Sequence, residues 1–426
     1  MNRLILVGNG FDLAHNLKTS YANFIKWYFE DLIEQVRSCQ SDRYDEDPLC
    51  QFSIKRSPDP IYGRNAKFSE FTHDQIKGYI EHTLSSVISY DKTDPIKVEL
   101  CPLIRRIAQS FETRKWVDIE NEYYSLLKER HRGNVAIYSS IDKLNKEMAF
   151  LTQKLAEYLC NVTTGIVEED IIVDAIKCYM LEPFSIDDIS IGGKQALCDH
   201  INSRLILLKK ELSPIIDSAD IELPTKTVDI EKYNAIEENL DEYFKGREKY
   251  EQLPIELRSP DKIMLLNFNY TNTADLYLPQ KDGYEVNHIH GTLSDVEKMI
   301  FGYGDELDDD LKNIIKRNDN DYLTNIKSIR YLETDNYRKL LSFIDSSPFQ
   351  IYIMGHSCGN SDRTMLNTLF EHKNCVSIKP FYYDKGDGKD NYIELIENIL
   401  RNFTDAKTMR DKVVNKSYCK PLPNHS

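Results

Sequence analysis

The sequence has no run of 18 consecutive apolar residues. A helix that crosses a bilayer needs about 20 predominantly apolar residues, so no membrane span is expected. The first three residues lead directly into the short apolar run LILV at 4–7, which is shorter than the apolar part of a signal peptide and ends at a glycine. We therefore expect a cytoplasmic protein that does not associate with membranes.

Paired cysteines and a surplus of basic residues are also missing. The nine cysteines are scattered without any CxxC spacing, which is typical of reduced thiols and of neither a disulfide framework nor a zinc site. The chain has 54 Lys and Arg residues against 69 Asp and Glu, a formal net charge of −15. Because proteins that bind nucleic acid neutralise phosphates with Lys and Arg, this composition disfavours nucleic acid as a partner.

What the chain does contain favours a folded core. Hydrophobic residues make up 41% of its 426 residues and aromatic residues 11%, which argues against disorder. This length suits two or three ordinary domains, or one domain with a large insertion.

Short apolar runs predict the strands of a parallel sheet. The first strand is expected in LILVG at 4–8, and five more runs follow residue 260: KIMLLNFNYT, YEVNHIHG, KMIFGYGDE, FQIYIMGHS and CVSIKPFYY. Helical patterns lie between several of them, and such alternation indicates a parallel sheet covered on both faces. We expect residues 1–39 and 260–405 to form one discontinuous α/β domain.

The middle of the chain predicts mainly helices. Between about 69 and 250, apolar residues recur at helical spacing, with a break expected in LPTKT at 223–227. Residues 40–68, rich in Ser, Asp, Arg and Pro, predict a loop. Residues 40–259 are therefore expected to be a large, mostly helical insertion, and 406–426 a C-terminal tail, loose over its last fifteen residues.

Three polar or glycine turns directly follow predicted strands: GNGFD at 8–12, NFNYTNT at 267–273 and GHSCGNSD at 355–362. In an open parallel sheet, ligands bind at the carboxyl ends of the strands, where turns expose N–H groups that suit phosphate. One such turn is weak evidence, and Leu13 stands where GxGxxG would need its third glycine. Three of them together predict a nucleotide site.

The second of these turns is rich in asparagine. Thr271 or Asn272 is expected to cap the following helix. Asn269 lies earlier, at the end of the predicted strand, and capping explains it less well. Its amide can donate to and accept from a ribose hydroxyl or a water molecule.

Two histidines stand in NHIHG. A spacing of two on a strand puts His288 and His290 on one face. A zinc pair would need further ligands, and no Cys or His cluster lies nearby in the sequence. His290 directly precedes Gly291 at a strand end, where a ligand can approach closely, although a buried histidine can also be purely structural.

Two acidic segments allow both structural and functional readings. In WVDIE, Asp118 and Glu120 cannot share a helix face, being two residues apart. Either one acid enters a site at the sheet edge, or both belong to a solvated face with Trp116 in the core. FGYGD at 301–305 is either the end of a strand that continues into a loop or part of a pocket wall. DELDDD at 305–310 is either a solvated acidic segment or a set of ligands for Mg²⁺.

The ordered motifs GNGFD, NxNYT, IHG, FGYG and GHSxxxSD resemble the AbiH family of bacteriophage abortive infection proteins. They are similar, more distantly, to sirtuin-like NAD-binding domains. Asn9 and Thr271 depart from the sirtuin pattern, which has Ala and Asp at these positions. The zinc cysteines of sirtuins are also absent, and this argues against a protein deacylase.

The resemblance implies a Rossmann-like (sirtuin/DHS-like) NAD-binding sheet and an enzyme that depletes NAD by hydrolysing its nicotinamide–ribose bond. It implies catalytic roles for Asn269 and His290, with His290 contacting a ribose hydroxyl or deprotonating the nucleophile. It further implies an NAD-binding set that comprises Gly8, Asn9 and Gly10 at the pyrophosphate, Asp12 and Asn267 beside the ribose or nicotinamide, and Gly355 and Ser357 at the adenosine half. No cofactor beyond NAD as substrate or ligand, and no metal, is expected.

Two other functions stay open from the sequence. The same fold can hold NAD or a derived nucleotide as a sensor without turnover. A metal-dependent nuclease or nucleotide hydrolase would need clustered carboxylates, for which DELDDD is the candidate. The sequence identifies neither the phage trigger nor the oligomeric state. The helical insertion is the natural place for assembly into a homo-oligomer or for sensing.

Overall fold

The computed structural model describes residues 1–426 except 56–66, 86–93, 115–117, 167–170, 218–222 and 425–426. The described chain forms two compact units. Unit 1 comprises Met1–Asn16, Ile166–Thr292 and Thr334–Ser426, and unit 2 comprises Leu17–Gly165 and Leu293–Glu333. Among the described residues, no helix has both the length and the apolar character that a membrane span requires.

Unit 1 is built on a five-stranded sheet in which all strands are parallel. The strands lie in the order β6-β5-β1-β7-β8, with bounds β1 (Asn2–Val7), β5 (Ile263–Asn267), β6 (Tyr284–His288), β7 (Phe349–Met354) and β8 (Cys375–Phe381). Numbered along the chain, this is the order 3-2-1-4-5, which corresponds to the first five positions of the 3-2-1-4-5-6 order of doubly wound α/β folds. The predicted parallel α/β sheet is therefore confirmed. Its topological switch point, where the connections change sides, lies between β1 and β7.

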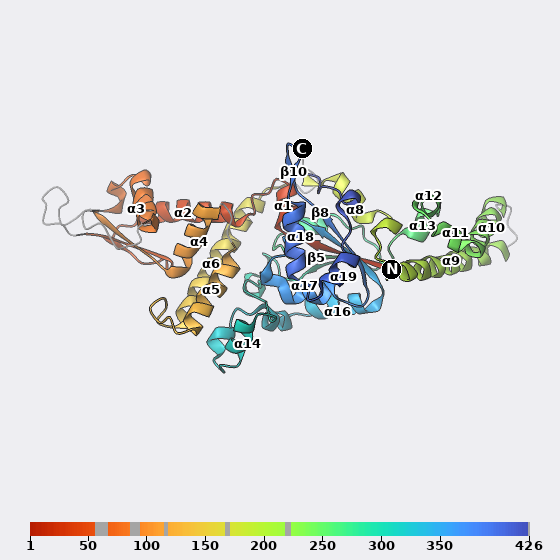
Figure 1. Ribbon diagram of the computed structural model, residues 1–426. Helices are drawn as coiled ribbons and strands as arrows, with labels where there is room; N and C mark the ends of the chain where they lie inside the picture. The colour runs from red at the N-terminus through yellow and green to blue at the C-terminus, as the bar shows by residue number, and fades with distance from the viewer. Residues whose placement is uncertain (56–66, 86–93, 115–117, 167–170, 218–222, 425–426) are drawn as a thin grey trace. The chain divides into compact units, whose positions relative to one another are not determined.

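The composition of the strands explains why they occupy the centre of unit 1. Every residue of β1, β5, β7 and β8 is buried, as expected for parallel strands covered on both faces. Helix α16 (Asn336–Ser346) contacts β6, while α17 (Arg363–Phe370), α18 (Tyr392–Arg401) and α19 (Ala406–Lys412) contact β8. Figure 1 shows these helices beside the sheet.

The remaining elements of unit 1 are mostly short. Helices α9 and α10 are its longest and contact each other (Figure 1). These elements are α1 (Asn9–Ala14), α8 (Asp174–Leu181), η3 (Ile186–Asp188), α9 (Lys194–Asp217), α10 (Leu223–Glu238), α11 (Leu240–Tyr243), α12 (Arg247–Tyr250), α13 (Ile255–Arg258), η4 (Thr273–Leu276), η8 (Asn360–Asp362), β9 (Asp384–Gly386), β10 (Lys389–Asp390) and η9 (Lys416–Tyr418).

Unit 2 combines helices with a small antiparallel sheet in the order β2-β3-β4. Its strands are β2 (Arg43–Tyr44), β3 (Cys50–Ile54) and β4 (Ile96–Leu100). Its helices are α2 (Tyr21–Ser38), η2 (Phe68–Glu70), α3 (His73–Ser85), α4 (Pro102–Arg114), α5 (Ile119–His131), α6 (Ile141–Thr163), η5 (Val296–Lys298), α14 (Asp309–Ile315), η6 (Asn320–Leu323), α15 (Lys327–Arg330) and η7 (Tyr331–Glu333).

Three expectations from the sequence were wrong. Residues 40–68 are not only a loop, because β2 and β3 lie within them. LPTKT at 223–227 is not a helix break, because α10 begins at Leu223. The last fifteen residues are not loose over their described part, since Val414 N donates to Ile378 O and Leu422 N to Tyr382 O.

The expected strand at 298–306 was also wrong. Only Tyr303 there forms a β-bridge, an isolated one with Ile326. Instead, Gly302 N donates to a carboxylate oxygen of Glu120 at 3.0 Å, and Lys327 Nζ lies 3.0 Å from the same carboxylate. A Cβ on Gly302 would lie 2.1 Å from Asn325 O. Close backbone contact and a buried ion pair therefore hold this segment within unit 2.

Candidate functional site

The candidate site lies at the carboxyl edge of the sheet in unit 1. Strands β6, β5, β1 and β7 are neighbours and parallel, so the turns that follow them leave the sheet at the same edge. Gly8, Asn269, His290 and His356 each stand within two residues of a strand end. Turns that are distant in the sequence thus meet at the position where doubly wound folds bind ligands.

The first and third turns contact each other through their glycines. Gly10 N donates to Gly355 O at 2.9 Å. A Cβ on Gly8 would lie 2.6 Å from the Cα of His356, and one on Gly355 would lie 2.0 Å from Phe11 N. Gly355 also has a φ of +79°, which strongly favours glycine. The close approach of these two turns therefore explains why glycine stands at these three positions.

Two predicted binding residues lie next to these glycines but are exposed to solvent. Asn9 begins α1 and is exposed, and Ser357 follows the glycine turn after β7 and is also exposed. The Ser357 carbonyl accepts a hydrogen bond from Asn398 at 2.8 Å. Both side chains thus lie nearer to solvent than the glycines beside them.

Asn269 and Asp12 are buried beside the first turn. Asn269 is 8% exposed, and its Nδ2 donates to Gly8 O at 3.0 Å. Asp12 is 1% exposed and accepts a hydrogen bond from Thr271 Oγ1 at 2.7 Å on Oδ2, while its Oδ1 lacks a hydrogen-bond partner among the described residues. Burial raises the pKa of Asp12 from 3.8 to about 6, and the hydrogen bond from Thr271 opposes this only in part.

Asn267 supports the turn that carries Asn269. Its Nδ2 donates to Thr271 O at 3.1 Å and lies 3.2 Å from His288 Nδ1, while its Oδ1 accepts from Asn269 N at 3.1 Å. The fully buried amide of Asn267 therefore fixes the backbone from which Asn269 projects.

His288 and His290 do not act as a pair, so the expectation that they share one face of a strand was wrong. Strand β6 ends at His288, and the chain then turns through Gly291, whose φ is +81°. His288 Nε2 lies 3.1 Å from Asp275 Oδ1, whereas His290 Nε2 lies 3.2 Å from Asp362 Oδ1. No group of three or more potential metal ligands occurs in the part of the chain that the structure describes.

Sequence reasoning missed two residues of this edge, His356 and Asp362. His356 Nδ1 accepts a hydrogen bond from Cys358 N at 3.0 Å, and its Nε2 lies 3.7 Å from Asp362 Oδ2. The ring of Phe268 lies 4.1 Å from the His356 ring and 5.2 Å from the His290 ring, between centroids. Both missed residues belong to GHSCGNSD, but an aspartate before a helix is usually interpreted as a cap.

These observations define an edge cluster that consists of Asp12, Asn269, His290, His356 and Asp362. All five side chains belong to buried residues of unit 1. They combine imidazoles, carboxylates and an amide, which are the groups that transfer protons and orient hydroxyls.

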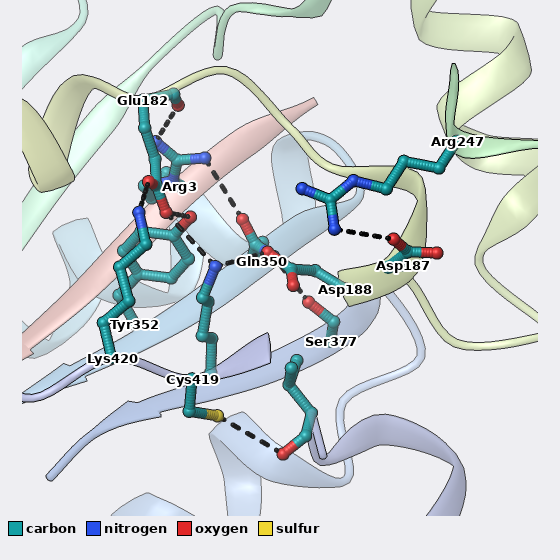
Figure 2. Close-up of polar contacts among 12 residues, drawn as sticks. Arg3, Glu182, Asp187, Asp188, Arg247, Gln350, Tyr352, Ser377, Cys419 and Lys420 are labelled. Atoms are coloured by element: carbon teal, nitrogen blue, oxygen red, sulfur yellow. Dashed lines mark hydrogen bonds and ion pairs between the residues drawn. The ribbon is translucent and has the colours of Figure 1, made fainter. Parts of the chain in front are cut away.

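A second polar cluster lies on one face of the same sheet. This face cluster consists of Arg3, Glu182, Asp188, Gln350, Tyr352, Ser377, Lys379 and Lys420 (Figure 2). Lys379 Nζ lies 2.8 Å from Asp188 and 3.3 Å from Glu182, and Tyr352 donates to Glu182 at 2.8 Å. The Arg3 guanidinium lies 4.3 Å from the centre of the Tyr352 ring. Ion pairs, hydrogen bonds and cation–π contact thus connect three strands to the segment around Glu182.

The acids of WVDIE have structural partners in unit 2. Asp118 caps α5 by accepting from Asn121 N at 3.0 Å. Glu120 is buried and paired with Lys327, so it does not belong to a solvated face. Trp116 lies outside the described residues.

The acidic run at 305–310 also contributes to the structure of unit 2. Asp308 caps α14 and accepts a hydrogen bond from Tyr124 at 3.0 Å. Asp310 lies 2.6 Å from Arg132. These two carboxylates therefore bind groups of the protein itself.

Comparison with known families identifies the family to which this chain is similar. Residues 4–384 match the family model described as bacteriophage abortive infection AbiH, a span that includes all the strand-end turns of the edge cluster. No curated protein and no solved structure matches the chain.

Proposed function

The chain belongs to the AbiH family of bacteriophage abortive infection proteins, and from this premise we propose that it hydrolyses NAD at the bond between nicotinamide and ribose. The reaction would deplete the NAD of an infected cell. One observation carries the proposal: the turns with Asn269 and His290 meet the glycine turn of β1 at the carboxyl edge of a sheet with the order 3-2-1-4-5. This is the place where doubly wound sheets bind dinucleotides.

The chemistry requires a base but no acid. The C1′–N bond of NAD breaks with its electron pair moving to the cationic nicotinamide nitrogen, which leaves as a neutral molecule. A water oxygen bonds to C1′, and its proton moves to His290, giving ADP-ribose, nicotinamide and an imidazolium. The transition state resembles an oxocarbenium ion, so the site must orient the ribose and exclude bulk water.

The other proposed roles follow from position. Asn269 is held by its bond to Gly8 O, and its amide would orient a ribose hydroxyl or the attacking water. The turn at Gly8, Asn9 and Gly10 would lie along the pyrophosphate, and Gly355 with Ser357 along the adenosine half. Asp12 points into the protein toward Thr271, which keeps its carboxylate away from an anionic ligand.

The test measures NAD in phage-infected cells, because a defence enzyme can be silent until it is triggered. Cells that carry the wild-type chain should lose NAD and accumulate nicotinamide after infection. His290→Ala and Asn269→Ala should slow this loss by about 10²–10⁴-fold. His372→Ala, which removes a histidine paired with the exposed Asp345 elsewhere in unit 1, is the matched control and should behave as wild type.

Protection from phage without any fall in NAD would overturn the proposal. If the purified chain then bound NAD without consuming it, the same site would be assigned to sensing. The departures at Asn9 and Thr271 from the sirtuin-like pattern keep this second function open.

A further inference from the structure

We infer that Asp362 is a positioning residue that fixes the proton of His290 on Nε2 and thereby makes Nδ1 its basic nitrogen. The catalytic consequence of this inference rests on the proposed function, but the protonation pattern itself does not. Three features of the described residues carry it: the unusual use of Asp362, the fixed state of His356 and the shared contact of both imidazoles with one carboxylate.

Asp362 stands where an aspartate would normally cap a helix. It is the N-cap residue of α17, yet its side chain makes no capping hydrogen bond. By contrast, the N-cap Asp405 of α19, in the same unit, accepts from Lys407 N and Thr408 N. A cap of this kind stabilises a helix by satisfying N–H groups of its first turn. The carboxylate of Asp362 is turned instead toward His290 at 3.2 Å and His356 at 3.7 Å.

The state of His356 follows from its hydrogen bond. The backbone N–H of Cys358 can only donate, so His356 Nδ1 must accept and carries no proton. The ring is therefore neutral, with its proton on Nε2 facing Asp362. This arrangement removes His356 as a candidate base, because its one lone pair is already used.

The Nε2 proton of His290 is held by the same carboxylate. The Nε2 of this ring is the nitrogen that faces Asp362 Oδ1, and a carboxylate can only accept, so the proton is held on Nε2. The lone pair of the neutral ring is then on Nδ1. A carboxylate that holds an imidazole in one tautomer and stabilises the imidazolium that forms later is a known device in acyl-transfer enzymes.

The neighbouring thiol does not compete for this role. Cys358 is fully buried, and burial, together with the charge of Asp362, raises the pKa of its thiol well above the ordinary value. Because a neutral thiol is a poor nucleophile, Cys358 does not compete with His290 as the reactive group. When Nδ1 of His290 takes the proton of water, the new positive charge faces the carboxylate of Asp362.

The test reads the protonation of the rings directly. In the full chain labelled with ¹⁵N-histidine, side-chain NMR should show the proton of both His290 and His356 on Nε2. Asp362→Asn keeps the shape but offers an N–H to the His290 Nε2, so His290 should change to the Nδ1–H form, while His356 stays as before because Cys358 N still fixes it. Asp345→Asn, which alters the exposed partner of His372, is the matched control and should change neither ring.

Activity gives the second readout. Under the proposed function, Asp362→Asn should lower kcat for nicotinamide release by about 10²–10⁴-fold and leave KM nearly unchanged. A proton on Nδ1 of His290 in the wild-type chain, or an unchanged Nε2–H form in Asp362→Asn, would overturn the inference. The wild-type spectrum decides even if the variant fails to fold. If NAD is not a substrate, the NMR result still stands, so the two failures are distinguishable.

Discussion

The face cluster and the edge cluster are two buried polar groups on one sheet, and they differ in how their charges are satisfied. In the face cluster, Glu182 binds Lys379, Lys420 and Tyr352, and Lys379 also binds Asp188. Although burial opposes it, the ammonium of Lys379 helps to hold the pKa of Glu182 below its ordinary value. In the edge cluster, burial raises the pKa of Asp12, and hydrogen bonds with Thr271, Thr273 and Asn269 oppose this shift.

This difference separates a network with paired charges from one in which the burial of Asp12 is opposed by hydrogen bonds. Within the described chain, Arg3 Nε is the one buried polar side-chain atom of the face cluster without a hydrogen-bond partner. Closed networks of this kind fix a fold, because breaking them leaves a buried charge uncompensated. Burial raises the pKa of one carboxylate in each cluster, but the ammonium of Lys379 opposes the shift of Asp188, whereas hydrogen bonds oppose that of Asp12. Burial of a carboxylate without a counter-charge is frequent at sites that bind or react.

The largest change in the free energy of unfolding is expected for a substitution in the face cluster. Lys379→Met removes the ammonium between Asp188 and Glu182 while keeping most of the side-chain volume. Asp188 is then buried without its counter-charge, and the free energy of unfolding should fall by about 3–5 kcal/mol in urea titrations. Lys385→Met, at an exposed pair with Glu394, should cost at most about 1 kcal/mol. Equal losses in the two variants would show that the face cluster is not the closed network described above.

The second prediction concerns Asp12 of the edge cluster, where a substitution should raise the stability of the protein by an amount that depends on pH. Asp12 has a pKa of about 6 in the folded protein against 3.8 as its ordinary value, so between these values the folded chain binds the extra proton. Its contribution to stability is therefore fully present below about pH 4 and is lost as pH rises through about 6, a change of about 3 kcal/mol. Asp12→Asn cannot ionise and should be more stable than wild type by up to about 3 kcal/mol at pH 7.

The control for this prediction is the pH series itself. The stability difference between Asp12→Asn and wild type, measured by urea unfolding, should shrink toward zero near pH 4. A difference that is constant from pH 4 to 7 would mean that Asp12 does not titrate as described.

The smallest effect concerns a single hydroxyl of the face cluster. Tyr352→Phe removes the hydrogen bond to Glu182, but this carboxylate keeps Lys379 and Lys420. We expect a loss of about 1 kcal/mol in thermal or urea unfolding, because the hydrogen bonds of a satisfied network are individually modest. A loss as large as that of Lys379→Met would instead indicate that the ring orders the whole cluster around Arg3.

The sequence predicted the centre of the sheet because four of its strands, β1, β5, β7 and β8, are fully buried. Runs such as LILV and FQIYIM leave few alternatives to a central parallel strand, and both formed one. The same criterion failed at KMIFGYGDE, where Phe301 and Tyr303 are equally buried but lie in an irregular segment. The apolar residues of this segment predict correctly that it is buried. They do not predict its irregular backbone, which the contacts of Glu120 with Gly302 and with Lys327 explain.

The edge cluster was predicted in part for a similar reason. Asn269 and His290 stand next to strand ends, so the sequence pattern located them at the carboxyl edge. Asp362 stands seven residues beyond the glycine turn, at the start of a helix, and a single sequence does not reveal that its side chain turns away from that helix. The packing function of Gly8, Gly10 and Gly355 was likewise invisible, because it depends on a contact between two distant turns.

The order of the strands also has a consequence for biosynthesis. β1 is translated first, but its partners β5 and β7 follow only after residues 263 and 349 have been made. At about 5–20 residues per second, β1 waits on the order of tens of seconds for both neighbours. An edge built from Gly8, Asn269, His290 and Asp362 cannot exist during that time. The turns that carry these residues therefore come together only when translation is nearly finished.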